Sequence, residues 1–166
     1  MPLLLRKIDH KVKWAKGGEA SKYLPPEQAP ADVLHDLKTE DNRLSVWQIE
    51  DDKSNLTRVI AAIVSTREYL QKLDYILIDF RHIQENGLRV ERESGDTLDK
   101  QANSWHVDVI QLSASDLARL ANLLFANGER VRELEPQLLN MLRQSVNAGH
   151  IHEAELKPTV AQKLQV

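Results

Sequence analysis

The sequence predicts an α+β fold in which an antiparallel or mixed sheet of four to five strands is covered by one long amphipathic helix and followed by C-terminal helices. Short stretches alternate or run continuously in β-forming residues, one long stretch repeats apolar residues at helical spacing, and helical patterns dominate after residue 113. A chain of 166 residues has the usual length of one domain, so residues 1–166 are treated as a single domain. The strands are expected at residues 5–14, 43–49, 75–79, 88–93 and 104–112.

The first strand is predicted from an alternation that runs from Arg6 to Trp14. From Ile8 onward, apolar or aromatic residues and His10 occupy every second position, and lysine or aspartate fills the positions before and between them. This period of two is typical of a half-buried strand, here with one basic edge. Residues 17–30 then contain two adjacent glycines and three prolines, so we expect a mobile loop there.

Residues 55–72 carry the clearest helical pattern in the chain. Apolar residues recur at spacings of three and four from Leu56 to Leu70, which places them on one face of a helix. Ser54 or Asp52 is available as the N-cap. We therefore expect this helix to cover the sheet.

Three further segments complete the predicted sheet. Residues 74–80, "DYILIDF", form a continuous apolar run that favours a buried strand, and residues 88–93 alternate apolar and charged side chains. Residues 104–112, "SWHVDVIQL", follow a polar connection and predict the last strand. Trp14, Trp47 and Trp105 all fall within predicted strands, so we interpret them as core or sheet-face residues.

Helical signals mark the C-terminal part. Ser113 and Asp116 fit a capping box, and Gly128 follows the apolar stripe that begins there. A second helix, at about residues 135–146, has Pro136 in its first turn and is followed by Gly149. Residues 156–166 are expected to form a last, frayed helical piece.

Charge is distributed unevenly along the chain. The net charge is −3, but residues 1–22 hold six lysines and arginines against two acidic residues, so this part carries +4 and the remainder −7. Basic residues near aromatic ones can bind nucleic acid. Alternate lysines on an edge strand can instead prevent aggregation, and we favour this second interpretation. The candidate nucleic-acid surface consists of Arg6, Lys7, Lys11, Lys13, Trp14 and Lys16.

Residues 149–153, "GHIHE", are the place where a metal site would be sought. His150 and His152, with Glu153 or Glu155, have the ligand types that suit zinc. Their spacing matches no recognised zinc motif, and a histidine after a helix-ending glycine can interact with the last free carbonyl groups. We favour this helix-end role and predict neither a metal nor a cofactor.

His106 and Asp108 are the candidate catalytic residues. They lie two positions apart on the last predicted strand, so both side chains point to one face, where the carboxylate could orient the imidazole for acid–base chemistry. A structural His–Asp pair is the alternative that we favour, because no nucleophile or oxyanion donor accompanies the pair in the sequence.

The sequence contains no cysteine, no phosphate-binding glycine motif and no signature of a common enzyme class. The apolar run near the N-terminus is only three leucines long, which is too short for a signal peptide or a membrane span. We therefore expect a cytoplasmic protein that does not contact membranes. The absence of a convincing site favours a bacterial, non-enzymatic module that binds another protein, such as an accessory, antitoxin-like or immunity-like protein. The alternatives are a small hydrolase-like enzyme that uses His106 and Asp108, and nucleic-acid binding by the basic strand.

Overall fold

The computed structural model describes residues 1–9 and 11–165, and a six-stranded antiparallel sheet runs through its centre. The strands are β1 (Leu3–Ile8), β2 (Leu44–Ile49), β3 (Lys72–Asp79), β4 (Arg89–Arg92), β5 (His106–Ile110) and β6 (Glu129–Leu134). Across the sheet their order is β4-β5-β2-β1-β3-β6, and each neighbouring pair is antiparallel.

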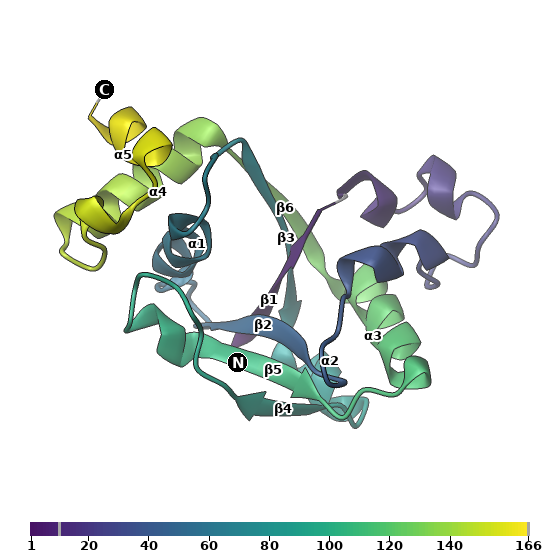
Figure 1. Ribbon diagram of the computed structural model, residues 1–166. Coiled ribbons are helices and arrows are strands. Elements are labelled where there is room, and N and C mark those ends of the chain that lie inside the picture. The colour runs from purple at the N-terminus through teal and green to yellow at the C-terminus, as the bar shows by residue number, and fades with distance from the viewer. Residues whose placement is uncertain (10, 166) are drawn as a thin grey trace.

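Helices cover both faces of this sheet. They are α1 (Leu56–Ser65), α2 (Phe80–Glu85), α3 (Ala114–Asn127), α4 (Glu135–Asn147) and α5 (Pro158–Leu164). Short 3-10 helices occupy Lys11–Trp14, Glu19–Ser21, Ala31–Asp36, Ala102–Trp105 and Glu153–Glu155. The side of the sheet that carries α3 is called the first face here, and the side that carries α1, α4 and α5 is called the second face (Figure 1).

Each face has its own hydrophobic core, because successive residues of a strand point to opposite sides. Leu4 belongs to the core of the first face and its neighbour Leu5 to that of the second. Strand β3 is buried at every position from Leu73 to Ile78, since both of its faces are covered. This burial explains why residues 74–80 form a continuous apolar run rather than an alternating one.

The predicted α+β class and the antiparallel sheet are confirmed, but the number of strands and the helical cover differ from the prediction. The sheet has six strands rather than four to five, and helices pack on both faces instead of one long helix on one. Strand β6 was not predicted because four of its six residues are charged. It pairs only with β3 and forms an edge of the sheet, where charged side chains are tolerated.

The first predicted strand is shorter and lies elsewhere in the sheet than expected. Strand β1 ends at Ile8 and is a central strand between β2 and β3, so the interpretation of its lysines as guards of a sheet edge is wrong. Lys11–Trp14 form a 3-10 helix, and His10 lies outside the described residues. The Trp14 ring is fully buried, and its indole N–H donates to the Asp36 carboxylate at 2.9 Å. Burying this large ring with its N–H hydrogen-bonded stabilises the fold more than continuing the strand to residue 14 would, so the chain leaves the strand after Ile8.

Helix α1 is shorter than predicted and begins with a different residue. It ends at Ser65 rather than near residue 72, and Leu70 is buried in the connection that follows. Its N-cap is Asn55, whose side chain makes no capping bond. The Asn55 amide instead accepts a hydrogen bond from the backbone N–H of Glu50 and donates to the carbonyl of Gln48. The residue thereby ties the start of the helix to the end of β2.

The C-terminal elements agree closely with their sequence signals. Ser113 and Asp116 form the predicted capping box at the start of α3. Pro136 lies in the first turn of α4, and α5 begins at Pro158. Within the described residues, none of the helices combines the length and the apolar character needed to cross a bilayer.

Candidate functional site

The strands β2, β5 and β4 carry polar side chains on the second face. Val107 and Val109 of β5 enter the core of the first face, so His106 and Asp108 point to the opposite side. In the described part of the chain, the core of the second face takes no residue from β4 or β5. Among the described residues no α-helix packs on this end of the second face, although the loop after β4 shields His106. Its polar residues are called the open polar patch: Arg43, Ser45, Glu91, Glu93, His106 and Asp108.

Ser45 and His106 form the central contact of the open polar patch. The Ser45 hydroxyl lies 2.5 Å from Nε2 of His106, and the Nδ1 of the same ring lies 2.9 Å from the backbone carbonyl oxygen of Glu93. Because a carbonyl oxygen only accepts hydrogen bonds, Nδ1 carries the proton of the neutral imidazole. Nε2 then accepts the hydrogen bond from the Ser45 hydroxyl, so a hydroxyl donor meets a basic nitrogen.

The position of the imidazole ring is held by packing as well as by hydrogen bonds. Trp47 meets the His106 ring edge-on, with ring centroids 5.0 Å apart and an interplanar angle of 77°. The loop after β4 approaches closely, since a Cβ atom at Gly95 would lie 2.9 Å from the Trp47 ring. The N–H of Gly95 also donates to the carbonyl of Asn103. These contacts fix the loop that carries the Glu93 carbonyl.

Asp108 does not orient His106 in the way expected from sequence. Its carboxylate oxygen Oδ1 lies 3.9 Å from Nε2 of His106, beyond hydrogen-bond distance, whereas its Oδ2 accepts from Nε of Arg43 at 2.9 Å. Arg43 also pairs with Glu91 and Glu93 at 3.2 and 3.1 Å. The hydrogen bond to Asp108 is the main cause that raises the pKa of Arg43. Asp108 is thus a partner of arginine rather than of histidine.

The open polar patch borders a solvent-accessible depression of about 390 Å³. The turn Glu40–Arg43 forms one part of it and bends through Asp41 and Asn42, whose φ values of 50° and 58° are typical of a tight hairpin turn. The depression brings the Ser45 hydroxyl group together with side chains of both charges. It is lined by Lys38, Glu40, Asp41, Arg43, Ser45, Glu93 and Asp108.

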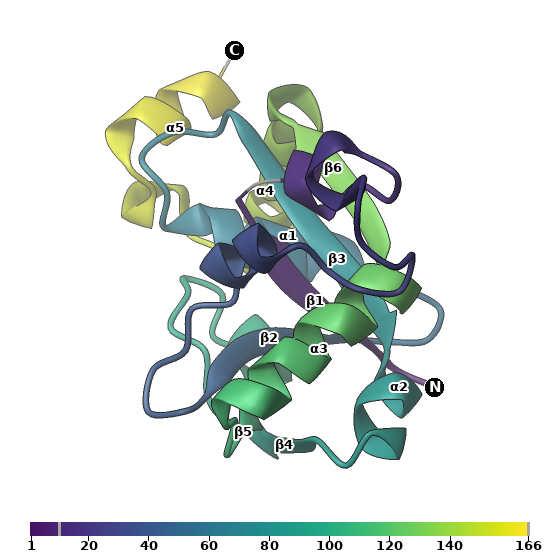
Figure 2. The same cartoon turned by 90° about the vertical axis from the view of Figure 1, so that its right-hand side faces the viewer.

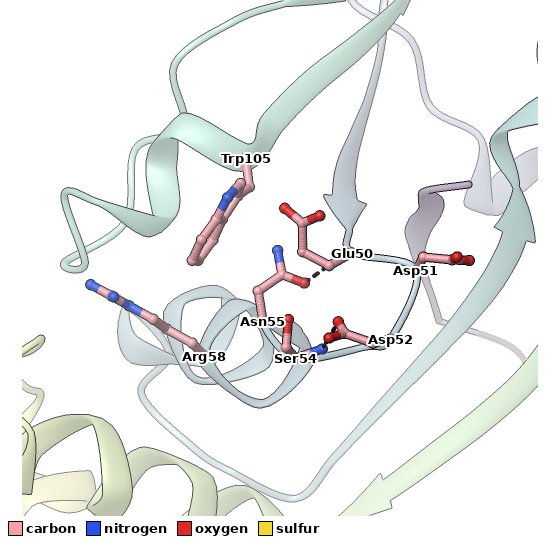
Figure 3. A pocket seen from close by; sticks show the side chains of 7 residues that line it. All are labelled: Glu50, Asp51, Asp52, Ser54, Asn55, Arg58 and Trp105. Carbon is pink, nitrogen blue, oxygen red and sulfur yellow. Dashed lines mark hydrogen bonds between the residues drawn. The ribbon is translucent and has the colours of Figure 1, made fainter.

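A second, larger depression of about 880 Å³ lies at the start of α1 (Figure 3). Trp105 lies above the first turn of the helix, and the Arg58 guanidinium is 5.7 Å from the centre of its ring. Arg58 also makes two hydrogen bonds to Asp99, at 2.6 and 2.9 Å. Burial acts to raise the pKa of Asp99, but the bonds from Arg58 and the backbone outweigh it and lower the pKa. The lining residues are Glu50, Asp51, Asp52, Ser54, Asn55, Arg58 and Trp105.

The proposed nucleic-acid surface is not one strand face. The Arg6 guanidinium donates to the carbonyls of Ser45 and Asp36, both at 2.7 Å, and burial lowers its pKa. The Trp14 ring has no exposed area on which a base could stack. Nζ of Lys16 donates to a carbonyl at the end of α3, at 2.6 Å. Lys7 remains on β1, whereas Lys11 and Lys13 lie on the following 3-10 helix.

His150 and His152 stand at the end of α4. Gly149 has a φ of +74°, and the N–H of His150 donates to the carbonyl of Ser145 at 2.9 Å, which terminates the helix. His152 is the N-cap of the next 3-10 helix. Among residues 1–9 and 11–165, no three histidine, cysteine, aspartate or glutamate side chains gather in a way that could hold a metal ion.

Sequence reasoning found two residues of the open polar patch and missed Ser45 and Arg43. The first four residues of the strand predicted at 43–49 carried a signal, since Arg43 and Ser45 alternate with the apolar Leu44 and Val46 and therefore share one face of the predicted strand. What was missing was the pairing of β2 with β5, which sets Ser45 opposite Asp108 and Trp47 opposite His106.

The sequence matches no protein-family model, and comparisons with curated proteins and with solved structures give no match. Function is therefore argued from the geometry of these surfaces alone.

Proposed function

We propose that the protein works by binding another protein through the segment that follows β1. This segment, residues 11–26, is called the basic lobe. The observation that carries the proposal is Tyr23, whose side chain is 89% exposed on a segment that is otherwise firmly attached to the fold. Aromatic side chains displayed in this way are typical anchors of protein interfaces.

The attachment of the basic lobe rests on three interactions. The Trp14 ring is buried in the core of the first face, and Lys16 donates to the carbonyl of Ala126 at the end of α3. The lobe also lies against α3 around Phe125 (Figure 2). These contacts hold Trp14 and Lys16 against the fold, so a partner would lose less conformational entropy on binding the lobe than on ordering a wholly free loop.

The outer surface of the basic lobe combines apolar groups with positive charge. Val12 is 78% exposed and Leu24 39% exposed, in addition to Tyr23. Between Leu24 and Phe125 lies a depression of about 300 Å³, lined mostly by apolar surface. The lobe carries four lysines and one acidic residue, Glu19. These features support a protein partner that offers an acidic surface and an apolar side chain for the depression.

The same surface fits a protein better than a nucleic acid. A nucleic-acid surface would need phosphate contacts and exposed stacking rings, but Arg6 is engaged with backbone carbonyls and Trp14 is buried. Tyr23 remains as the exposed aromatic group of the lobe, with the Lys22 ammonium 5.6 Å from the centre of its ring. An accessory, antitoxin-like or immunity-like role is the class of function that we propose on this basis.

The experiment is affinity capture from nuclease-treated extract of the source organism, with three baits. Wild-type protein and Tyr69→Ala, a control at a 63% exposed tyrosine outside the lobe, should recover the same partner. The double variant Tyr23→Ala/Leu24→Ala should lose it. With the purified pair, the double variant should raise the dissociation constant about 30-fold, as expected when interface anchors are truncated.

Two results would contradict the proposal. If all three baits recover the same proteins, the basic lobe is not the binding surface. If capture depends on nucleic acid, and Lys11→Glu/Lys13→Glu abolishes binding to mixed-sequence DNA or RNA in 200 mM salt, the lobe is a phosphate-binding surface instead.

A further inference from the structure

The contact between Ser45 and His106 has the geometry of an activated nucleophile. A serine becomes reactive when a base accepts its proton and a third group holds that base in the correct tautomer. Here Nε2 of His106 is 2.5 Å from the Ser45 hydroxyl, and the Glu93 carbonyl holds the proton on Nδ1. A carbonyl thus takes the orienting role that sequence reasoning had assigned to Asp108.

Ser45 is more exposed than His106, as expected when a nucleophile must meet a substrate and its base must be held in place. Ser45 is exposed on β2, whereas only 12% of the His106 side chain is accessible. The imidazole is packed against Trp47, so it is held in place while the hydroxyl faces solvent. A substrate can therefore reach Ser45 without displacing the base.

The charges around the pair restrict the substrate. The depression beside Ser45 is lined by two cationic residues, Lys38 and Arg43, and by four carboxylates. Arg43 is itself paired with carboxylates, and Lys38 is the other cationic residue that lines the depression. The excess of negative charge disfavours substrates that carry a carboxylate or phosphate near the reacting bond.

We propose that Ser45 is the nucleophile and His106 the general base of an acyl-transfer site that accepts neutral acyl esters. This activity is separate from the binding surface on the basic lobe, because the site lies on the second face and the lobe is attached to the first. Ser45 Oγ attacks the acyl carbonyl carbon, and its proton moves to Nε2 of His106. The bond to the ester oxygen breaks, and the leaving alcohol takes that proton. Water then repeats the sequence, which releases the acid and restores Ser45.

The first test is covalent labelling with a fluorophosphonate, which reacts with activated serines. The Ser45 oxygen forms a bond to phosphorus, fluoride leaves with the electron pair of the broken bond, and His106 accepts the proton. We expect one label per chain at Ser45 in wild-type protein and in Ser54→Ala, a control at an exposed serine of the other depression. Ser45→Ala should take up none, and His106→Gln should react about 100-fold more slowly with an unchanged melting temperature.

The absence of cysteine from the chain permits a second, independent test. Ser45→Cys introduces the sole thiol, whose reaction with iodoacetamide at neutral pH reports its thiolate fraction. We expect it to react at least about tenfold faster than the thiol of Ser45→Cys/His106→Gln. Equal rates for these two thiols, or wild-type protein that the fluorophosphonate leaves unmodified or labels elsewhere, would show that the pair is only a structural hydrogen bond.

Discussion

The two halves of the second face are built from the same alternating strands but have opposite character. Under α1, α4 and α5, strands β1 and β3 present leucines and an aromatic ring, and these side chains are buried. On β5 and β4 the equivalent positions hold histidine, aspartate and glutamate, and within the described residues no α-helix packs on them. The comparison teaches that helical cover, rather than strand pairing, decides where the second face is a core and where it is available for chemistry.

Each half also contains an arginine–aspartate pair, and the two pairs differ in burial. Asp99 and Arg58 are 1% and 18% exposed, whereas Asp108 and Arg43 are 11% and 33% exposed. Removing one partner of a buried pair leaves an uncompensated charge, which costs far more than the loss of a solvated pair. The following substitutions test this difference.

The largest effect is expected from Arg58→Ala. The Asp99 carboxylate would keep its bonds to the backbone N–H groups of Gln101 and Ala102 but would lose its counter-charge. We expect the free energy of unfolding at pH 7 to fall by about 3–5 kcal/mol. Urea denaturation measures this change. A loss no larger than that of Arg43→Ala would mean that the two pairs are energetically alike.

A cavity under α1 should rank next. Ile60 is fully buried in the core of the second face, so Ile60→Ala should lower the free energy of unfolding by about 2–5 kcal/mol. Ile63 lies on the same helix but is only partly buried, so Ile63→Ala should cost less. Glu68→Ala, at an exposed residue, is the control. Equal denaturation midpoints for the three variants would show that α1 does not cover this half as described.

The first face offers a test by pH. Asp74 is buried and makes two hydrogen bonds to Arg132, which join β3 to β6. Burial acts to raise the pKa of Asp74, but the pairing with Arg132 outweighs it, so the pKa in the folded protein is lowered. The unfolded chain then binds the proton more tightly, and this contribution to stability is present above about pH 4 and is lost as pH falls through the lowered pKa.

Asp74→Asn should therefore flatten the acid limb of the stability profile. Between about pH 5 and pH 3 the variant should lose less stability than wild-type protein. Asp96→Asn, at an exposed aspartate, should follow the wild-type curve. Thermal denaturation across this range measures both. If the stability of Asp74→Asn and of wild-type protein falls equally with pH, the Asp74–Arg132 pair does not contribute to stability in the way described.

The smallest effect is expected from Arg43→Ala in the open polar patch. Its partners Glu91 and Glu93 are more than half exposed, so water can replace the arginine there, whereas only 11% of the Asp108 side chain is accessible and its carboxylate would lose a hydrogen bond. The free energy of unfolding should fall by about 1–3 kcal/mol, less than for Arg58→Ala because this pair is more exposed. Chemical denaturation of Arg43→Ala and Arg58→Ala under the same conditions compares their losses in free energy of unfolding. A loss as large as that of Arg58→Ala would show that the patch is part of the structural framework.

Much of the fold could be predicted from sequence because its signals lie within a few residues of each other. The capping box of α3, the proline at the start of α4 and the left-handed Gly149 all act within one helical turn, and each was found where expected. Strand β6 lacked such a signal, since the partners of its charged residues, such as Asp74, lie on β3, which is distant in the sequence.

The sequence by itself determined the α+β class, the position of most elements and two of the six residues of the open polar patch. Only the tertiary structure decided which strands are neighbours, that Trp14 leaves the strand for the core, and that Ser45 meets a histidine 61 positions away. Arg58 and Asp99 are likewise 41 positions apart. Periodicity reports only which face of its own element a residue occupies, whereas these contacts depend on how distant elements pair and pack, because burial and hydrogen bonding are satisfied over the whole chain together.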